Sequence, residues 1–342
     1  MNILIIGGSG FLSGTCVRMA LAAGHQVFTI TRGTRPVFDG PTTLIADRHD
    51  HAAFQTVVSR ALESVGGSFD LVIDAIPFQP EDAEQDLAVF GGLTTRLVFV
   101  STDFVYDPSR RRFPQSEDDA DYIADGYGGK KRAAEQILLQ AGTDELPWVV
   151  VRPGHIYGPG SQLGCLPPVG RDPQLIDRLR SGEPIELVGG GHFLQQPVFV
   201  EDLARVILDL GGVSLPDTGA DQGSTQSSVP TAGTAGFAGG KAVRAPATVS
   251  SPVGQILNVA GPDVVESWQY YQVIADRVGE RLSVTEIPVD EFQKEHPDKA
   301  SFLCHRFYTM DRLVGTGVRP PETPLSVGLA RHVESLISPA EE

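Results

Sequence analysis

The stretch Ile3-Leu4-Ile5-Ile6-Gly7-Gly8-Ser9-Gly10-Phe11-Leu12-Ser13-Gly14 joins an apolar run to a glycine-rich turn and then to a helical pattern. A continuous apolar run is typical of a parallel strand that is buried on both faces. Glycines allow positive φ and let a pyrophosphate approach the backbone, while the helix start supplies amide donors and a favourable dipole. The stretch therefore predicts a dinucleotide site, with Gly7, Gly10, Phe11 and Leu12 next to the cofactor.

Short apolar runs alternate with longer helical stretches from residue 1 to residue 153. Alternation of this kind indicates an α/β fold in which strands and helices follow one another. We therefore expect a doubly wound parallel (Rossmann) sheet in a dinucleotide-binding domain of residues 1–153. The predicted strands are 3–6, 26–31, 43–46, 71–74, 97–101 and 148–152, and the predicted helices between them are 13–23, 52–63, 81–90 and 127–140.

The pattern changes after residue 153, where turns rich in Gly and Pro separate shorter elements. We expect residues 154–342 to form a smaller substrate-binding lobe, with some segments returning to the sheet. Within residues 212–254, 30 of the 43 residues are Gly, Ala, Ser, Thr or Pro and four are charged. Such a segment buries too little apolar surface to order itself, which predicts a flexible low-complexity insertion. Helices are predicted at 172–180, 200–210, 267–278 and 324–336, and a strand at 255–259.

The composition limits the classes of function. The 342 residues include 27 Lys and Arg against 43 Asp and Glu, which makes the net charge −16. Nucleic acid and anionic lipid both reward a basic surface, so we expect neither as a partner. Cys16, Cys165 and Cys304 have no paired spacing, which predicts neither a metal site nor a disulfide framework. The N-terminal apolar run is too short for a signal peptide and no stretch is long enough to span a membrane, so we expect a cytoplasmic protein.

The residues that follow the second and third strands bear on the choice of cofactor. An acidic residue at the end of the second strand would bind the ribose 2′-hydroxyl of NAD, but this chain has Thr31-Arg32-Gly33 there. A guanidinium suits the 2′-phosphate of NADP, so Arg32 favours NADP and leaves NAD as the alternative. Asp47 and Arg48 follow the third strand, where we expect them to reach the adenine edge.

A tyrosine and a lysine stand four residues apart in Tyr127-Gly128-Gly129-Lys130-Lys131, at the start of a predicted helix. That spacing places Tyr127 and Lys131 on one helix face. A free phenol with a pKa of ~10 is a poor base, and a neighbouring ammonium would lower that pKa towards neutrality. Thr102 ends the fifth strand, at the edge that faces the cofactor, so its hydroxyl is expected to hold a substrate oxygen beside Tyr127.

Together these residues resemble the extended short-chain dehydrogenase/reductase superfamily, in its NAD-dependent epimerase/dehydratase branch. The resemblance implies that Tyr127 is the acid/base, that Lys131 binds the cofactor ribose and lowers the tyrosine pKa, and that Thr102 orients the reacting hydroxyl. It also implies that the C-terminal lobe forms the substrate site, and homodimers are common in the family. The segments that carry the resemblance are 7–14, 47–48, 101–106, 127–131, 152–159, 198–204, 257–261 and 326–333.

The sequence departs from the family pattern at three positions. Ser13 stands where the third glycine is usual, which puts close packing of helix and strand in doubt. Phe104 replaces the glutamate that is typical of 4,6-dehydratases, so the expected base for that reaction is missing. Gln195 stands where sugar-nucleotide epimerases commonly have an arginine for the substrate pyrophosphate, and a neutral amide cannot clamp a diphosphate bidentately.

Further polar residues are predicted near the substrate. Asp103 follows Thr102, and His155 lies on the loop after the sixth strand, so both join Gln195 as candidate contacts to a polar small molecule. By contrast, Arg110-Arg111-Arg112 is followed by acidic residues that offset its field, and we interpret this basic run as a solvated loop.

These observations leave three functional hypotheses. The leading one is an NAD(P)-dependent enzyme, either an oxidoreductase or an isomerase, that transfers hydride at a secondary alcohol or ketone of a sugar-like polar substrate. An NADPH-dependent ketone reductase of a non-nucleotide substrate is the alternative within the same chemistry. A non-catalytic dinucleotide-sensing or RNA-associated scaffold is the alternative from another class, and the presence of Tyr127 and Lys131 argues against it.

Overall fold

The computed structural model describes residues 1–36, 39–118, 120–167, 171–215 and 249–337. Residues 216–248 of the insertion predicted at 212–254 lie outside the described residues. Within the described part of that segment, Val213 is buried in the same core as the central sheet.

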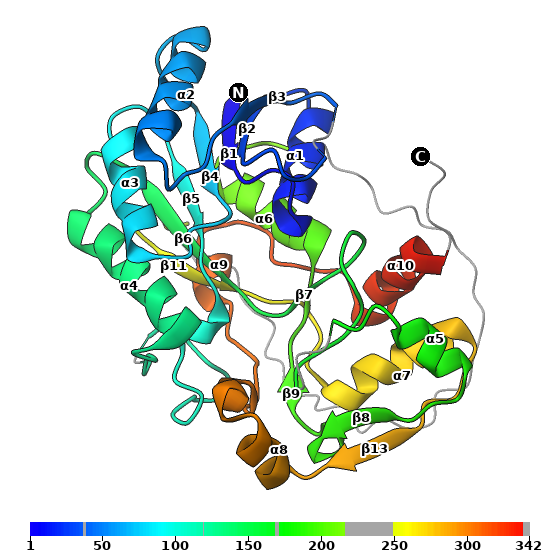
Figure 1. The fold of residues 1–342 in the computed structure, drawn as a ribbon. Helices are drawn as coiled ribbons and strands as arrows, with labels where there is room; N and C mark the ends of the chain where they lie inside the picture. Colours follow the sequence, from blue (N-terminus) through cyan, green and yellow to red (C-terminus); the bar gives the residue numbers. More distant parts are fainter. Residues whose placement is uncertain (37–38, 119, 168–170, 216–248, 338–342) are drawn as a thin grey trace.

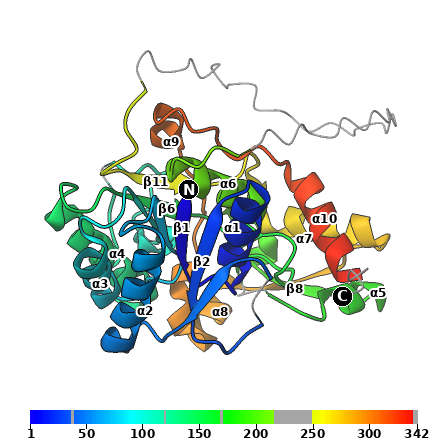
Figure 2. The ribbon, with the colours of Figure 1, turned by 90° about the horizontal axis from the view of Figure 1, so that it is seen from above.

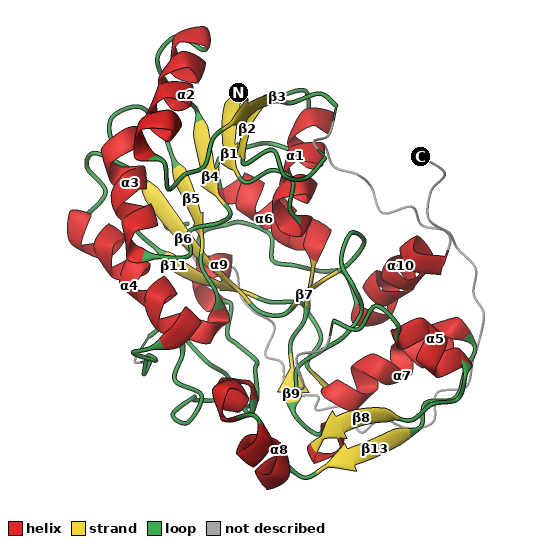
Figure 3. Ribbon diagram, in the orientation of Figure 1, coloured by secondary structure: helices red, strands yellow, loops and turns green. Residues whose placement is uncertain are grey.

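A seven-stranded parallel sheet forms the centre of the fold, with the strand order β11-β6-β5-β4-β1-β2-β3. All six strand pairs in it are parallel, as expected for strands joined by crossover helices. The prediction of a doubly wound Rossmann sheet is confirmed (Figure 3). The strands are β1 (Asn2–Ile6), β2 (Gln26–Thr31), β3 (Thr42–Ile45), β4 (Leu71–Asp74), β5 (Leu97–Val100), β6 (Trp148–Pro153) and β11 (Ile256–Val259).

Helices cover both faces of this sheet (Figures 1 and 2). Side chains alternate along each strand, so Ile3 and Ile5 join the core on one face and Leu4 and Ile6 join the core on the other. The first core contains side chains of α1 and α6, and the second contains side chains of α2, α3 and α4. These helices are α1 (Phe11–Ala22), α2 (His51–Ser64), α3 (Pro80–Phe90), α4 (Gly126–Ala141) and α6 (Val200–Leu210).

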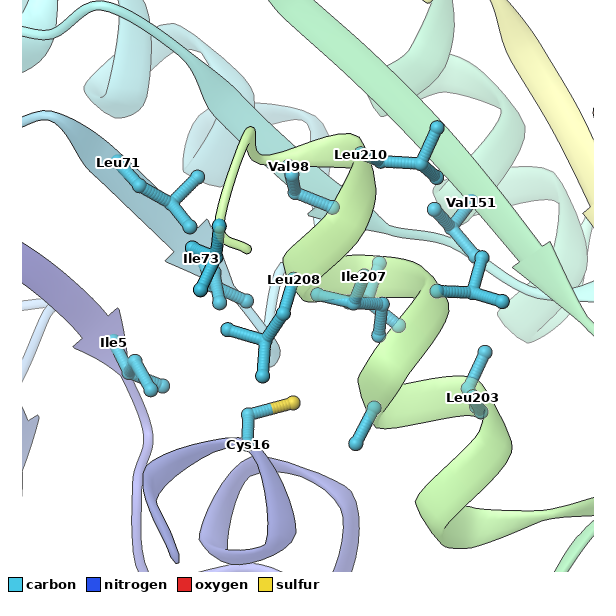
Figure 4. Close-up of a cluster of buried hydrophobic side chains, with 14 of the residues drawn as sticks. Ile5, Cys16, Leu71, Ile73, Val98, Val151, Leu203, Ile207, Leu208 and Leu210 are labelled. Atoms are coloured by element: carbon cyan, nitrogen blue, oxygen red, sulfur yellow. The ribbon is translucent and has the colours of Figure 1, made fainter. Parts of the chain in front are cut away.

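The helix α6 belongs to the sheet layer although it follows the sixth strand by almost fifty residues. Its residues Leu203, Ile207 and Leu208 point at the sheet and at Cys16 of α1 (Figure 4). The strand β11 likewise returns to the sheet beside β6. The division of the chain at residue 153 stays a prediction, and these two segments are the parts of 154–342 that join the sheet.

The remaining C-terminal elements form a smaller lobe beside the carboxyl ends of the strands (Figure 1). Its core packs Tyr157, Tyr270, Ile274 and Leu329 together. The helices are α5 (Leu175–Arg180), α7 (Ser267–Val278), α8 (Val289–Glu295), α9 (Asp311–Gly315) and α10 (Leu325–Ile337), of which α9 packs near β11. The short strands pair as β7 (Ile156–Tyr157) with β10 (Val198–Phe199), β9 (Leu194–Gln195) with β12 (Val265–Glu266), and β8 (Ile185–Val188) with β13 (Val284–Ile287).

Candidate functional site

The glycine turn between β1 and α1 brings the backbone to the carboxyl edge of the sheet. Gly7 and Gly8 have φ angles of +116° and +86°, which other residues rarely adopt. A Cβ on Gly8 would lie 2.6 Å from Cγ2 of Thr29, so the turn also needs glycine for space. The helix then begins at Phe11, and the first amides of a helix have no partner within it. Phe11 and Leu12 therefore present donors where an anion binds best.

Ser13, at the position of the third family glycine, is accommodated inside the first turn of α1. Its hydroxyl oxygen accepts a hydrogen bond from the amide of Gly10 at 3.1 Å, and the residue is buried. The small side chain thus ties the glycine turn to the helix instead of separating them.

A cavity of about 330 Å³ lies between the glycine turn and the ends of β2, β3 and β4. Gly7 and Gly10 form one wall, Arg32 and Arg35 lie at the end of β2, and Asp47 lies at the end of β3. The structure therefore brings together the predicted residues of the adenosine half of the site. The sequence analysis missed Arg35 and Phe78, although the basic Thr31–Arg35 segment and an aromatic residue after β4 were visible signals.

Arg48 also lies at the cavity wall, but its guanidinium has other partners. It is buried and pairs with the carboxylates of Asp74, Asp82 and Asp86 at 2.7, 3.0 and 3.2 Å. Burial works to lower the pKa of Arg48, but the three carboxylates outweigh it and raise that pKa. The side chain thus joins β3 to α3 beneath the cavity, and the cofactor contact expected of it stays a prediction.

Tyr127 and Lys131 lie in the first turns of α4, as expected, but their surroundings differ. Lys131 is buried, and its Nζ donates to the carbonyl oxygens of Pro77 at 2.9 Å and Val100 at 2.5 Å. Tyr127 is half exposed, and its ring meets the ring of Phe104 edge-on at 6.2 Å. The lysine is therefore anchored between the ends of β4 and β5, and the tyrosine faces outward beside it.

The pKa of Tyr127 lies above its usual value in this structure. Burial raises this pKa, while the neighbouring Thr102 hydroxyl works to lower it. The ammonium of Lys131, one helical turn further along α4, donates to the two carbonyl oxygens of Pro77 and Val100. The lowering of this pKa that we expect from Lys131 together with the positive nicotinamide ring of a bound cofactor stays a prediction. Thr102 lies beside Tyr127, and its hydroxyl accepts from the amide of Phe104 at 3.3 Å, while its contact with a substrate oxygen stays a prediction.

Asp103, a predicted substrate contact, is instead the centre of a buried polar cluster. Arg306 and Arg111 pair with its carboxylate, and the hydroxyl of Tyr308 donates to it at 2.5 Å. Burial works to raise the pKa of Asp103, but the two guanidinium groups outweigh it and lower that pKa. The interpretation of Arg110-Arg111-Arg112 as a solvated loop is wrong for Arg111, because the charge on Asp103 draws its side chain inside.

The other two predicted substrate contacts lie in the smaller lobe. Burial lowers the pKa of His155 to about 4, with Arg171 acting in the same direction, so this histidine is neutral at pH 7. Its ring meets that of Tyr270 edge-on at 5.9 Å. Gln195 is fully buried in β9, and neither atom of its amide group has a hydrogen-bond partner among the described residues.

The residues present fit a dinucleotide. The cavity, the amides at the start of α1 and the close approach of Gly8 to Thr29 form a cradle for phosphate. Lys131 lies farther along the same edge of the sheet, between the ends of β4 and β5. Within the described part of the chain, no three His, Cys, Asp or Glu side chains gather as metal ligands would.

Comparison with known proteins agrees with this geometry. The NAD-dependent epimerase/dehydratase family matches residues 84–210, a range that includes Thr102, Tyr127 and Lys131. Among the helices that the structure describes, none is long and apolar enough to cross a membrane.

Two curated relatives show the same level of similarity. The chain is 29% identical over 223 residues to the chloroplast stem-loop binding protein of 41 kDa b of Arabidopsis thaliana, a match that covers 62% of this chain and 55% of that protein. It is 29% identical over 220 residues to the 2-alkyl-3-oxoalkanoate reductase of Stenotrophomonas maltophilia, covering 60% of this chain and 63% of that protein. Each match thus spans less than two thirds of the relative.

A solved structure matches over nearly the full length of the chain. The UDP-glucose 4-epimerase of Thermus thermophilus, solved as a complex with NAD, superposes with a TM-score of 0.66 and 18% identity. The match covers 99% of this chain and 100% of that one, which shows a common fold.

Proposed function

We propose that this chain, which matches the NAD-dependent epimerase/dehydratase family over residues 84–210, is an extended short-chain dehydrogenase/reductase. It reduces a ketone of a sugar-like polar substrate with NADPH. The observation that carries this proposal is the pair of arginines, Arg32 and Arg35, that line the cavity at the end of β2. An NAD site would have a carboxylate there for the ribose 2′-hydroxyl.

The arginines favour a cofactor with a 2′-phosphate. Both are exposed side chains at the mouth of the cavity, so they meet a phosphate without a prior desolvation penalty. A guanidinium binds phosphate through two parallel hydrogen bonds, which a ribose hydroxyl cannot match. Asp47, which follows the neighbouring strand β3 and lines the same cavity, is our candidate for the adenine amino group.

The catalytic residues divide the work on the substrate. The nicotinamide supplies or accepts the hydride when bound. Tyr127, half exposed at the sheet edge, donates the proton that turns a developing alkoxide into an alcohol. We assign to the Thr102 hydroxyl beside it the task of holding the substrate oxygen. We assign to the ammonium of Lys131, one turn further along α4, the positive field that favours the phenolate left behind.

Net reduction is favoured over epimerisation by two observations. Gln195 stands where sugar-nucleotide epimerases commonly have an arginine that binds the substrate diphosphate. An epimerase needs that tight grip on the nucleotide, because the oxidised sugar must rotate in the site before it is reduced again. A relative of the chain is also a named reductase. Epimerisation with a retained cofactor is the second candidate, and the fold it needs is present.

Cofactor titration tests the proposed preference. We expect NADPH to bind the purified protein at least about tenfold more tightly than NADH, and Arg32→Ser to remove about tenfold of NADPH affinity while NADH affinity stays constant. Arg60→Ser is the matched control, because Arg60 is an exposed arginine of α2 away from the cavity. Analysis of the nucleotide released on denaturation adds a second readout, and tightly held NAD(H) would support the epimerase instead.

The variant Tyr127→Phe tests the catalytic assignment. Because it removes one hydroxyl from a half-exposed ring, we expect NADPH to bind as before and ketone-dependent NADPH oxidation to fall by about 10²- to 10⁴-fold. Lys130→Gln, which removes an exposed neighbouring charge, leaves the rate unchanged. A non-catalytic scaffold would show no difference between these proteins, and full activity of Tyr127→Phe would refute the assignment.

A further inference from the structure

A group of buried polar side chains lies between the catalytic loop and the smaller lobe. We call Asp103, Arg111, Arg306, Tyr308 and Gln195 the arginine cluster. Asp103 follows the end of β5, and Arg111 comes from the loop after it. Arg306 and Tyr308 belong to the segment between α8 and α9, which runs beside Gln195 through a bridge between Gln195 and Arg306.

The cluster contains more positive than negative charge. Within the described residues, the guanidinium groups of Arg111 and Arg306 pair with one and the same carboxylate, that of Asp103. Burial raises the pKa of Tyr308 further above its usual range, so its hydroxyl stays neutral and carries no compensating charge. The side chains of Arg111 and Arg306 are only 1% and 3% exposed. An unbalanced buried cation is costly unless an anion accompanies it.

The cluster also contains unused hydrogen-bond donors. Nε of Arg111, Nε of Arg306 and Nε2 of Gln195 are buried without an acceptor among the described residues, and Oε1 of Gln195 is buried without a donor. The adjacent Gln196 shows what a satisfied buried amide looks like here, because it donates to the carbonyl of Gly261 and accepts from the amide of Tyr308, both at 2.8 Å. Buried polar groups in proteins are nearly always partnered, so these donors mark a place for an acceptor.

The cluster lies next to the catalytic tyrosine. The guanidinium of Arg306 lies over the ring of Phe104 at 4.1 Å, and that ring meets Tyr127 edge-on at 6.2 Å. Arg306 is thus separated from the tyrosine by one aromatic ring, which is within the span of a small metabolite. A group bound by the cluster would belong to the molecule that reacts at Tyr127.

We propose that the arginine cluster binds an oxyanion of the substrate, through Arg306 and Gln195. The excess of positive charge calls for an anion, and the unpartnered donors call for an acceptor with several lone pairs. A carboxylate or a phosphate group satisfies both, whereas a neutral hydroxyl satisfies neither the charge nor the number of donors. This inference rests on the proposed function and adds to it a substrate class, ketones that carry an acidic group.

Anion binding to the cofactor-loaded protein tests this inference. The protein is first saturated with NADPH so that the dinucleotide site is filled, and inorganic phosphate, succinate and UDP are then titrated separately by calorimetry. We expect at least one of them to bind, and Gln195→Met and Arg306→Lys each to weaken it about tenfold, because each removes donors without a large change in volume. Arg110→Gln is the control, because Arg110 is an exposed arginine next to Arg111 and lies outside the cluster.

The preferred anion identifies the acidic group. Succinate indicates a carboxylate, inorganic phosphate a phosphate monoester, and UDP a nucleotide diphosphate. Circular dichroism and NADPH affinity show that each variant is folded, and the two variants report independently. If the NADPH-loaded protein binds none of the three anions, or if neither variant weakens their binding, the inference is overturned. A protein that does not bind NADPH refutes the proposed function instead.

Discussion

Lys131 is buried, and among the described residues no carboxylate is in direct contact with its ammonium, which determines how its charge responds to pH. Burial lowers its pKa to about 8, although Asp74, Glu135 and Asp82 work to raise it. The ammonium of Lys131 donates its direct hydrogen bonds to the carbonyl oxygens of Pro77 and Val100. Its charge therefore changes within the pH range where the enzyme can be assayed.

This predicts an alkaline decline of the reaction. Below about pH 8 Lys131 is charged and supports the phenolate of Tyr127, and above it the charge is lost, so we expect kcat for ketone reduction to fall as the pH rises through about 8. The measurement is the pH profile of kcat at saturating NADPH. In the variant Lys131→Arg the side chain stays charged above pH 8, so we expect its kcat to decline only at higher pH, even if its kcat is lower at every pH. A decline at the same pH in both proteins would contradict this role, and Lys130→Gln is expected to keep the wild-type profile.

The start of α4 shows how an element places its catalytic side chains. Gly128 packs directly against the carbonyl oxygen of Phe104, and Gly129 against that of Ala124, so a Cβ at either position would collide with backbone. These glycines let α4 approach the loop after β5 closely enough for Tyr127 to reach Thr102. The segment Tyr-Gly-Gly-Lys-Lys thus carries both the catalytic candidates Tyr127 and Lys131 and the two glycines that allow the helix to pack closely against backbone.

We predict that Gly128→Ala harms both stability and activity. Backbone atoms cannot move aside as a flexible side chain can, so we expect the free energy of unfolding to fall by about 1–3 kcal/mol and turnover to fall with it as Tyr127 is displaced. The matched control is Gly315→Ala in α9, where the nearest atom to a new Cβ is Oγ of Ser250 at 3.8 Å. That change is expected to be neutral or slightly stabilising in a urea titration. Equal stability of the two variants would contradict the close contact.

At the scale of the whole molecule, the core of the N-terminal Rossmann sheet includes side chains of α6 and β11, which come from residues 154–342. Leu208 and Ile207 of α6 are fully buried against the sheet and α1 (Figure 4). We therefore expect Leu208→Ala to lower the free energy of unfolding of the entire protein by about 2–5 kcal/mol. Thermal melts followed by circular dichroism and by loss of NADPH binding would shift together. Leu139→Ala, at a residue that is 44% exposed, is the control with little effect.

Much of the fold could be predicted from sequence because its signals are local. The apolar runs predicted as strands form β1, β2, β4, β5 and β6, which are buried on both faces. The stretches predicted as helices between them form α1, α2, α3 and α4. The strands β7, β9, β10 and β12 have two residues each, too few for any period to be visible. The predicted catalytic residues Thr102, Tyr127 and Lys131 came from a strand end and a helix start, positions that short motifs define well.

The arginine cluster could not be predicted in the same way. Asp103 and Arg306 are 203 residues apart, and Arg111 belongs to a basic run that resembles a solvated loop. A weak signal existed in His305-Arg306-Phe307-Tyr308, because alternate residues of an extended segment face the same side. Nothing in that alternation says which side is buried or which carboxylate lies there.

The sequence by itself determined the glycine turn, the alternation of strands and helices, and the tyrosine–lysine pair, because each depends on residues within a few positions of one another. The tertiary structure alone decided the partners of the buried charges. It placed Arg48 against three carboxylates of β4 and α3, Lys131 between two carbonyls, and Arg306 beside Phe104. The physical reason is that a charge removed from water takes whichever opposite charge or dipole the packing brings near, and that neighbour comes from a distant part of the chain.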